Sequence, residues 1–320
     1  MFLNTTKKKN QEFNTPILLI IFNRPQYIKK ILEVLKKTKP QTLYIAADGP
    51  RTEVEADIIN CTMVKELILK NIDWDCKVFK KFRSKNIGLK KNINDAIDWC
   101  FEYEQNCIIL EDDCLPDESF FKFCQFALHE YEDNKTIKII SGNYYMEHIV
   151  TKNSFYFSRC PGTHGWAIWK DRWQENDKKM SDWKGFREFF WLFYFFKFNF
   201  SIAHFFYQKF KLSFYGKINS WDYQLLYSIW KKDGLIIRPY KNLCKHIGWG
   251  ADSTHGKGND TFPGLNISKM KFPIVIPPEI TINEKLDSLE HKLVRKIYFF
   301  RYFLRLIKFN VMKIFNRHHH

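Results

Sequence analysis

Asn106-Cys107-Ile108-Ile109-Leu110-Glu111-Asp112-Asp113-Cys114 is the stretch of this chain that decides the fold. Its short apolar run predicts a buried strand, and three carboxylates follow directly where that strand ends. Adjacent carboxylates repel one another and are costly to desolvate, so such a cluster needs a cation, a basic partner or open water. At the carboxyl edge of a parallel sheet, a cation would lie where α/β folds place their ligands. The alternative is a solvated acidic turn, and the surrounding sequence decides between the two.

The sequence before this stretch alternates strands and helices. Residues 15–22 form a continuous apolar run, which is typical of a strand buried on both faces, and residues 27–35 repeat apolar side chains at helical spacing. A second strand over residues 43–50 ends in an Asp-Gly turn, and a helix near residues 53–70 leads to a third strand at residues 76–82. This alternation predicts an open, mostly parallel sheet flanked by helices, with its ligand crevice at the carboxyl ends of the strands.

Polar residues follow three of the predicted strands. Asn23-Arg24 ends the first strand, Asp48-Gly49 ends the second and Glu111-Asp112-Asp113 ends the fourth. Because these strands are expected to run parallel, their polar ends should lie along one edge of the sheet. A solvated acidic turn would not produce this convergence, so the pattern favours a ligand site.

The loop after the third strand adds further polar groups to that edge. Gly88 allows close backbone approach, and the amides of Asn86 and Asn92 can hold a ring edge or a hydroxyl group. The alternative interpretation is a glycine-containing loop that only caps the next helix, residues 93–102.

Beyond Asp113 the alternation weakens and aromatic residues become dense. The chain contains 31 Phe and 10 Trp, and residues 182–215 place apolar side chains on every side of a predicted helical extension. Either this segment is buried in a second lobe, or its surplus face meets lipid or another subunit. Residues 248–258 are long and glycine-rich, which is typical of a mobile active-site lid.

The charge of the chain points to an anionic partner. Lys and Arg number 51 against 35 Asp and Glu, a formal net charge of +16. Residues 291–317 carry eight basic side chains and no acidic one around a single apolar stripe, which predicts an amphipathic helix on an anionic membrane surface. The alternative is a terminal helix docked on the protein's own core. No RNP-like or helix-turn-helix pattern accompanies the charge, so we expect no nucleic-acid partner.

The eight Cys include no C-x-x-C pair and no zinc-finger spacing, so we expect reduced thiols in a cytoplasmic protein. Residues 1–13 are polar, and we expect neither a signal peptide nor a membrane span there. We interpret residues 318–320, three His, as the remnant of a purification tag.

Taken in order, these motifs resemble glycosyltransferases with the GT-A, nucleotide-diphospho-sugar transferase fold, over roughly residues 15–260. The residues that carry the resemblance are Ile20 to Arg24, Asp48-Gly49, Asn86 to Asn92, Leu110 to Asp113 in the place of the family's Asp-x-Asp motif, Gly165-Trp166, Trp221-Asp222 and Arg238-Pro239. The order is similar to that in the inverting N-acetylglucosaminyltransferase of N-glycan maturation and in bacterial capsule and lipopolysaccharide transferases.

The resemblance implies roles for individual residues. Asp113 would ligate Mn²⁺ or Mg²⁺, and Asp222 would be the general base of an inverting transfer. Contacts with the nucleotide-sugar donor are implied for Phe22, Asn23, Arg24, Asp48, Asn86, Gly88, Asn92, Glu111, Asp112, Gly165, Trp166 and His255. Lys245, His246 or His255 would be available to the diphosphate. One departure is that the eukaryotic enzyme follows its Trp with two carboxylates, whereas here Tyr223 takes the second place.

The resemblance also implies an organisation and a setting. We expect a flexible N-terminus (1–14), a nucleotide-sugar-binding half (15–143), an acceptor-side catalytic half (144–260) with the aromatic-rich insertion, a linker (261–290) and the basic helix (291–317). The acceptor would be a glycan or a lipid-linked sugar in bacterial surface polysaccharide synthesis. The protein would lie in the cytoplasm, at the inner face of the cytoplasmic membrane.

Two other functions remain open from sequence. A sugar-phosphate nucleotidyltransferase of the same fold would need a glycine-rich basic loop after the first strand, and residues 22–26 contain no Gly. A non-catalytic, membrane-associated scaffold with a degenerate transferase fold is the other alternative, and the presence of Asn23, Asp48, Asp113 and Asp222 argues against it.

Overall fold

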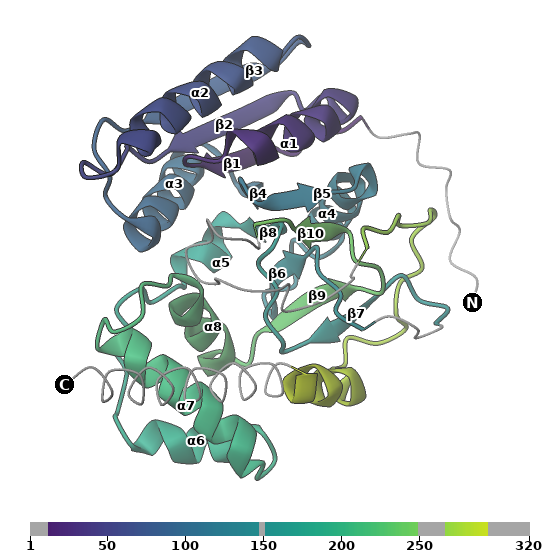
Figure 1. Cartoon of the computed structure of the whole chain (residues 1–320). Helices are drawn as coiled ribbons and strands as arrows, with labels where there is room; N and C mark the ends of the chain where they lie inside the picture. Colours follow the sequence, from purple (N-terminus) through teal and green to yellow (C-terminus); the bar gives the residue numbers. More distant parts are fainter. Residues whose placement is uncertain (1–11, 147–150, 249–265, 294–320) are drawn as a thin grey trace, which may run out of the picture.

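The computed structural model describes residues 12–146, 151–248 and 266–293 of the chain. Its central sheet is built from β1 (Ile17–Ile21), β2 (Thr42–Ala47), β3 (Lys77–Phe82), β4 (Asn106–Glu111), β6 (Ile137–Ser141), β7 (Phe155–Ser158), β8 (Trp166–Trp169) and β9 (Leu235–Pro239). These eight strands lie in the order β3-β2-β1-β4-β8-β6-β9-β7 (Figure 1). A separate two-stranded ribbon pairs β5 (Cys114–Pro116) antiparallel with β10 (Cys244–His246).

Helices flank this sheet. They are α1 (Pro25–Thr38), α2 (Glu55–Asn71), α3 (Leu89–Tyr103), α4 (Glu118–Glu130), α5 (Lys170–Gln174), α6 (Arg187–Phe195), α7 (Phe200–Phe214) and α8 (Asp222–Lys231). Residues 284–293 are also helical. Among the described residues, no helix combines the length and the apolar character that crossing a bilayer requires.

Parallel pairing joins the first four strands of the sheet. β1 pairs in parallel with β2 and β4, and β2 pairs in parallel with β3, so the carboxyl ends of all four strands share one edge. Beyond β4 the sheet is mixed, because β8 runs antiparallel to both β4 and β6. The predicted α/β fold, an open and mostly parallel sheet flanked by helices, is confirmed.

The continuous apolar run of β1 follows from burial on both of its faces. Ile17, Leu19 and Ile21 belong to the core formed with α1, α2 and α4. Leu18 and Ile20 belong to the core on the other face, with α3 and the helices from α5 to α8. Truncating any of these side chains to Ala would cost roughly 2–5 kcal/mol of folding free energy.

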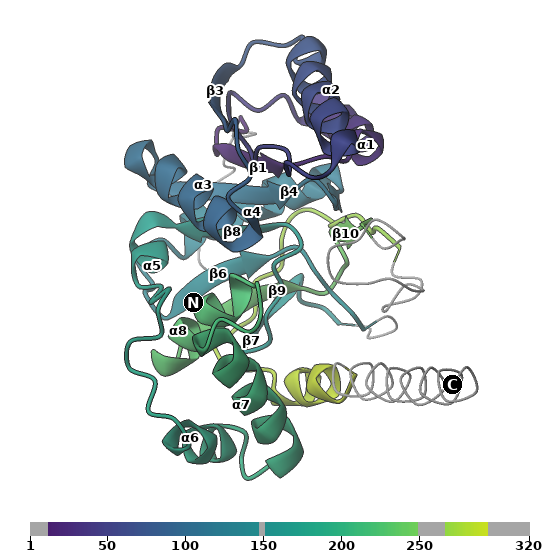
Figure 2. The same ribbon diagram turned by 60° about the vertical axis from the view of Figure 1, so that its left-hand side comes forward.

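The aromatic-rich segment 182–215 forms two helices instead of one continuous helix. Lys197 and Phe198 have positive φ angles of 50° and 64°, which end α6, and the Asn199 side chain caps α7 by accepting a hydrogen bond from the N–H of Ile202. Both Figure 1 and Figure 2 show α6 and α7 at the opposite end of the molecule from α1 and α2.

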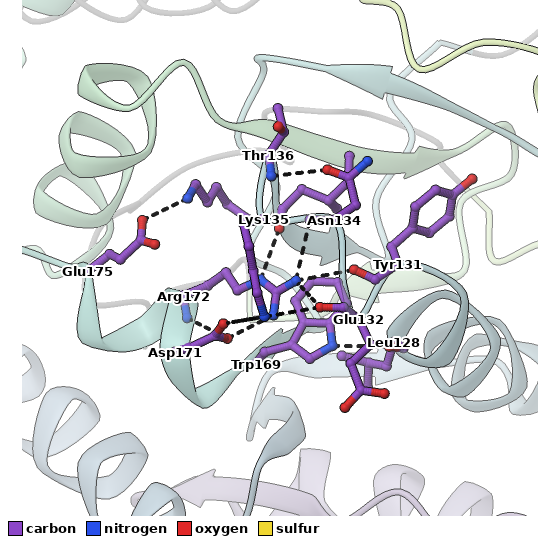
Figure 3. A network of polar contacts seen from close by, with 12 residues as sticks. Leu128, Tyr131, Glu132, Asn134, Lys135, Thr136, Trp169, Asp171, Arg172 and Glu175 are labelled. Atoms are coloured by element: carbon purple, nitrogen blue, oxygen red, sulfur yellow. Dashed lines mark hydrogen bonds and ion pairs between the residues drawn. The ribbon is translucent and has the colours of Figure 1, made fainter.

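A buried arginine fixes the connection between α4, β6 and α5 (Figure 3). The Arg172 guanidinium donates to the backbone carbonyls of Tyr131, Glu132 and Asn134, and its Cζ atom lies 4.1 Å from the centroid of the Trp169 ring. The same guanidinium pairs with Asp171 at 2.8 Å. These carbonyls follow the end of α4 and have no strand partner, so a fork of fixed donors is the group that can satisfy several of them at once.

The helix of residues 284–293 is docked on the sheet by polar contacts inside the protein. Arg238 on β9 is fully buried and lies 3.0 Å from Glu290, and Ser158 on β7 donates to Asp287 at 2.6 Å. His291 is buried against Cys160, with 3.3 Å between Nε2 and Sγ. Removing one partner of a buried ion pair such as Arg238–Glu290 costs about 3–5 kcal/mol, so this helix belongs to the folded body. The rest of the predicted basic helix, residues 294–317, lies outside the described residues.

Candidate active site

The ends of β1 and β4 are joined through the carboxylate of Asp112. This side chain accepts a hydrogen bond from the N–H of Phe22 at 2.8 Å and from Nη1 of Arg24 at 2.8 Å. Arg24 Nη1 also lies 2.7 Å from Oδ2 of Asp113, so one guanidinium serves both carboxylates. A basic partner from the end of the neighbouring parallel strand β1, one of the options that the sequence offered, thus stabilises the acidic cluster at the end of β4.

Asp113 faces a histidine that arrives from a distant part of the chain. The antiparallel pairing of β5 with β10 places His246 opposite Cys114, and the N–H of Ile247 donates to the Asp113 carbonyl at 2.7 Å. His246 Nε2 then lies 3.4 Å from Asp113 Oδ2. A carboxylate oxygen and an imidazole nitrogen therefore point to one place at the carboxyl edge of the sheet.

Tight packing under the ribbon sets the position of His246. A Cβ added to Gly165, whose φ is +72°, would lie 2.6 Å from the Cys244 sulfur, and one added to Gly142 would lie 2.9 Å from Cys244 Cβ. On the other side, a Cβ added to Gly248 would lie 2.7 Å from Oδ2 of Asp113. Real Cβ atoms do not come this close, so the three glycines let β10 approach Asp113.

The ionisation of the cluster follows from burial and charge. Burial opposes ionisation of Asp113, but the contacts with His246 and Arg24 outweigh it and hold the pKa of this carboxyl well below its usual range. Burial raises the pKa of Asp112 to about 6 against the opposing charge of Arg24. Burial, with Asp113 and Asp112 nearby, also raises the pKa of Glu111. Asp113 is therefore the carboxylate of the three that holds its negative charge most firmly.

A second histidine lies beside His246. The rings of His164 and His246 are 4.6 Å apart between centroids, and His164 Nδ1 lies 3.3 Å from the hydroxyl of Tyr145. Asn143 accepts a hydrogen bond from the N–H of His164 at 3.0 Å. Burial and the nearby His246 lower the pKa of His164 to about 3, so its imidazole is neutral at physiological pH. No role was predicted for His164, because its place before Gly165 in a glycine- and proline-containing run carries no signal of its own.

Asp222 begins α8 close enough to the cluster to influence it. Its charge is one of the causes that raise the pKa of Glu111, and it accepts a short hydrogen bond from the Ser220 hydroxyl. Trp221 immediately before it stacks on Trp166, with ring centroids 5.4 Å apart. Trp166 is fully buried, so in this structure it packs under Trp221 and supports the start of α8 from inside the core.

The predicted donor-side residues Asp48, Asn86 and Gly88 form a separate hydrogen-bonded group. The buried Asp48 carboxylate accepts from the N–H groups of Gly49, Ile87 and Gly88 at 2.9 to 3.1 Å. Asn86 Nδ2 donates to the Gly49 carbonyl at 2.9 Å. A Cβ on Gly49 would lie 2.3 Å from the backbone of Lys85, so this turn requires glycine. Asp48 therefore holds the loop between β3 and α3 in place through these hydrogen bonds.

Two further predicted contacts are also engaged within the protein. Asn23 donates to Asp57 at 2.6 Å, and Asn92 accepts from Arg83 at 3.2 Å. Asp57 is buried and also binds Arg51, yet its place in an ordinary helical pattern gave no sign of this contact. His255 lies outside the described residues, as does most of the predicted lid.

Asp113 and His246 could hold a divalent cation together with substrate oxygens. In residues 12–146, 151–248 and 266–293, no group of three or more His, Cys, Asp or Glu side chains could hold a metal ion by itself. Mg²⁺ is usually bound through one or two protein carboxylates with substrate phosphates, and Mn²⁺ shares the preference for oxygen ligands. Asp113 and His246 supply donor atoms of the kind that such a site uses, and a diphosphate would supply further oxygen ligands. Oδ2 of Asp113 also accepts from Arg24 in this structure, so the ion would share this carboxylate with the guanidinium.

Comparisons with known proteins give only remote similarities. No family model and no curated protein matches the sequence. Among solved structures, residues 1–349 of S. aureus TarS match with a TM-score of 0.34 and 10% identity, over 52% of this chain and 49% of that chain. The Pyrobaculum calidifontis mannosyltransferase PcManGT, in complex with GDP-Man and Mn²⁺, matches with a TM-score of 0.34 and 9% identity, over 51% and 46%.

HddC from Yersinia pseudotuberculosis matches with a TM-score of 0.30 and 13% identity, over 52% of this chain and 80% of that chain. The matched region spans about half of TarS residues 1–349 and of PcManGT. At these identities and TM-scores, the similarities assign neither a family nor a substrate to this chain.

Proposed function

We propose that this chain is a metal-dependent, inverting glycosyltransferase that moves a sugar from a nucleoside-diphosphate sugar, UDP-linked, to a hydroxyl group of the acceptor. The observation that carries the proposal is the convergence of Asp113 and His246, 3.4 Å apart, beside Arg24 at the carboxyl ends of β1 and β4. This edge is where open α/β sheets bind their ligands. Arg24 and the cation would together face the diphosphate.

On the donor side, Asp113 and His246 would hold Mn²⁺ or Mg²⁺. The ion supplies Lewis-acid stabilisation of charge on the leaving diphosphate, worth several kcal/mol. Asp112 positions Arg24 and the Phe22 backbone, and Asp48 positions the loop with Asn86 and Gly88. Glu111, Asn23, Asn92, Gly165 and Trp166 would line or support the same donor site.

On the acceptor side, Asp222 would take the proton of the attacking hydroxyl group. Two observations support this role: the charge of Asp222 acts on Glu111 at the end of β4, and Trp221, directly before it, stacks on the buried Trp166. A base that acts on the face opposite the leaving group gives inversion at the anomeric carbon.

The setting that we propose is bacterial surface polysaccharide synthesis at the inner face of the cytoplasmic membrane, with a glycan or lipid-linked acceptor. The basic, amphipathic sequence of residues 291–317 supports the peripheral membrane location. Most of that sequence lies outside the described residues.

Thermal-shift measurements against UDP-, GDP- and dTDP-sugars, each with and without Mn²⁺, test the proposal most directly. We expect stabilisation by one nucleotide class that requires the metal, and release of the nucleoside diphosphate when acceptor is added. Formation of pyrophosphate from a sugar 1-phosphate and a nucleoside triphosphate would instead identify a nucleotidyltransferase. Absence of any stabilisation would favour the scaffold alternative.

A further inference from the structure

The hairpin of α6 and α7 carries a row of exposed aromatic rings. Its members are Phe186, Phe190, Tyr194, Phe198 and Phe200, which we call the aromatic face, and their side chains are 59% to 75% exposed. The first four are spaced four residues apart, which places them along one side of α6 and its ends. The rings also touch, with 5.2 Å between the centroids of Phe186 and Phe190 and 6.0 Å between those of Tyr194 and Phe198.

The aromatic face is not the side of the hairpin that packs on the protein core. Phe189 and Leu192 on the other side of α6, and Phe206 and Phe210 on α7, are buried and already join the hairpin to the core. A contiguous row of exposed large apolar side chains is costly in water and marks an interaction surface.

Basic side chains outnumber acidic ones on the hairpin that carries the aromatic face, and one of them, Lys197, is paired with the exposed Glu284. Residues 184–217 contain six basic side chains and one acidic side chain, a balance of 6 − 1 = +5. The acidic residue, Glu188, is buried and lies 2.8 Å from Lys231, so it does not oppose a partner at the surface. Lys184, Arg187 and Lys211 are exposed.

We propose that the aromatic face binds the interfacial region of an anionic lipid bilayer. Aromatic rings sit favourably at the level of the lipid head groups, and basic side chains on the same element are attracted to anionic phosphates. Both views of the molecule place α6 and α7 at the end farthest from α1 and α2, where a flat membrane can reach the hairpin (Figures 1 and 2).

The binding has a consequence for catalysis that rests on the proposed function. The segment after α7 leads directly to Asp222 at the start of α8. A membrane-bound hairpin would therefore hold the candidate base close to an acceptor that is itself anchored in lipid.

Vesicle flotation of the full chain tests the binding without requiring turnover. We expect the protein to float with vesicles of phosphatidylglycerol and phosphatidylcholine, and to bind vesicles of phosphatidylcholine alone far more weakly. The triple variant Phe190→Ser/Tyr194→Ser/Phe198→Ser should lose at least about tenfold in partitioning onto the anionic vesicles. The matched control Ile58→Ser/Ile59→Ser removes exposed apolar side chains from α2 and should float like the wild type. Equal flotation of the triple variant and the wild type would overturn the proposal. The binding would then have to come from another part of the chain, such as residues 291–317, which are intact in both proteins.

A fluorescent label distinguishes the membrane from a protein partner. In a Cys76→Ser background, Tyr194→Cys labelled with an environment-sensitive dye should shift to the blue when anionic vesicles are added, and the shift should shrink in about 0.5 M salt. The same label at Tyr103→Cys, an exposed position on α3, should not shift. A label at position 194 that is blue-shifted without vesicles and unchanged by them would show that this chain or a second copy covers the face. Sedimentation of the wild type and the triple variant then shows whether the face is covered by the same chain or by a second copy. Either result rejects the lipid proposal.

Discussion

Nη1 of Arg24 lies 2.7 Å from Oδ2 of Asp113, the same carboxylate oxygen that faces His246. Arg24 comes from the end of β1 and Asp113 from the end of β4, so the contact crosses between neighbouring parallel strands. Two positive or potentially positive groups therefore share one carboxylate at the centre of the candidate site.

Replacing Arg24 with Met should destabilise the fold, because it leaves Asp112 and Asp113 adjacent and without their guanidinium. The loss should be about 3 kcal/mol, since both partners are largely buried. Urea denaturation of Arg24→Met, Asp112→Asn and the double variant measures it. In the double variant, part of the loss should be recovered, and strictly additive effects would contradict the pairing.

Asp113→Asn should lower the metal-dependent turnover of the nucleotide sugar by roughly 100-fold or more, because the charged oxygen ligand is lost. The stabilisation by Mn²⁺ with the donor should disappear in thermal-shift measurements, while circular dichroism stays unchanged. Asp133→Asn, an exposed carboxylate after α4, is the matched control. Full activity of Asp113→Asn in Mn²⁺ would refute the assignment of the ligand.

His246→Ala should weaken the metal site without removing it, because Asp113 remains. We expect a higher Mn²⁺ concentration for half-maximal activity and recovery of turnover when Mn²⁺ is raised. A titration of activity against Mn²⁺ measures this. An unchanged metal requirement would mean that His246 serves only to hold Asp113.

Asp222→Asn should lower the rate of transfer by about 10²- to 10⁴-fold while binding of the donor is retained, as expected for loss of a general base. Steady-state rates and donor affinity by calorimetry separate the two effects. Tyr223→Phe, at the next position of α8, should retain activity. Full activity of Asp222→Asn, with loss of activity in Tyr223→Phe, would show that Asp222 is not the base.

The contribution of His291 to the stability of the fold should decrease as the pH drops from about 6.5 toward 4. Burial lowers the pKa of His291 to about 4, whereas an exposed His has a pKa near 6.5, so the unfolded chain binds a proton that the folded chain resists. The shift corresponds to at most roughly 3 kcal/mol, fully lost below pH 4. The groups near this imidazole are Cys160, which contacts it, and the carboxyls of Asp287 and Glu290 on the same helix. Burial raises the pKa of Glu290 to about 7, so protonation of Glu290 opposes the effect of His291 and is common to the wild type and the variant.

Urea denaturation of the wild type and His291→Gln across this pH range measures the effect. The variant should show a smaller slope of stability against pH, and His129→Gln, an exposed position on α4, should keep the slope of the wild type. Equal slopes in the wild type and in His291→Gln would refute the contribution of His291.

The first half of the fold was readable from the sequence because its signals are local. The apolar run of β1 and the helical spacing of α1 depend on residues a few positions apart, and the order of strands and helices up to β4 follows from them. The break between α6 and α7 was not predicted, because Phe196, Phe198 and Phe200 carry the aromatic pattern across it. The positive φ angles there fall on Lys197 and Phe198, so no glycine signals them.

The candidate site was only partly readable. The carboxylates of β4 and Arg24 were predicted to meet, since parallel strands share an edge. The contact of Asp113 with His246 joins residues far apart in the chain through β10, a strand of three residues that no periodicity can reveal. Asp48 and Asn92 were predicted to contact a donor, but their side chains form hydrogen bonds within the protein. These partners could not be predicted, because they depend on the tertiary structure.

The packing of Gly142 and Gly165 against Cys244 sets how closely β10, and with it His246, can approach Asp113. Neither glycine contributes a ligand, yet a methyl group at either position would have to displace the strand that carries His246. A side chain at Gly165 would change the distance between the His246 imidazole and the Asp113 carboxylate, and with it the size of ion that the proposed site would accept. Selection or engineering could therefore retune ion preference here through backbone spacing, leaving every coordinating side chain in place.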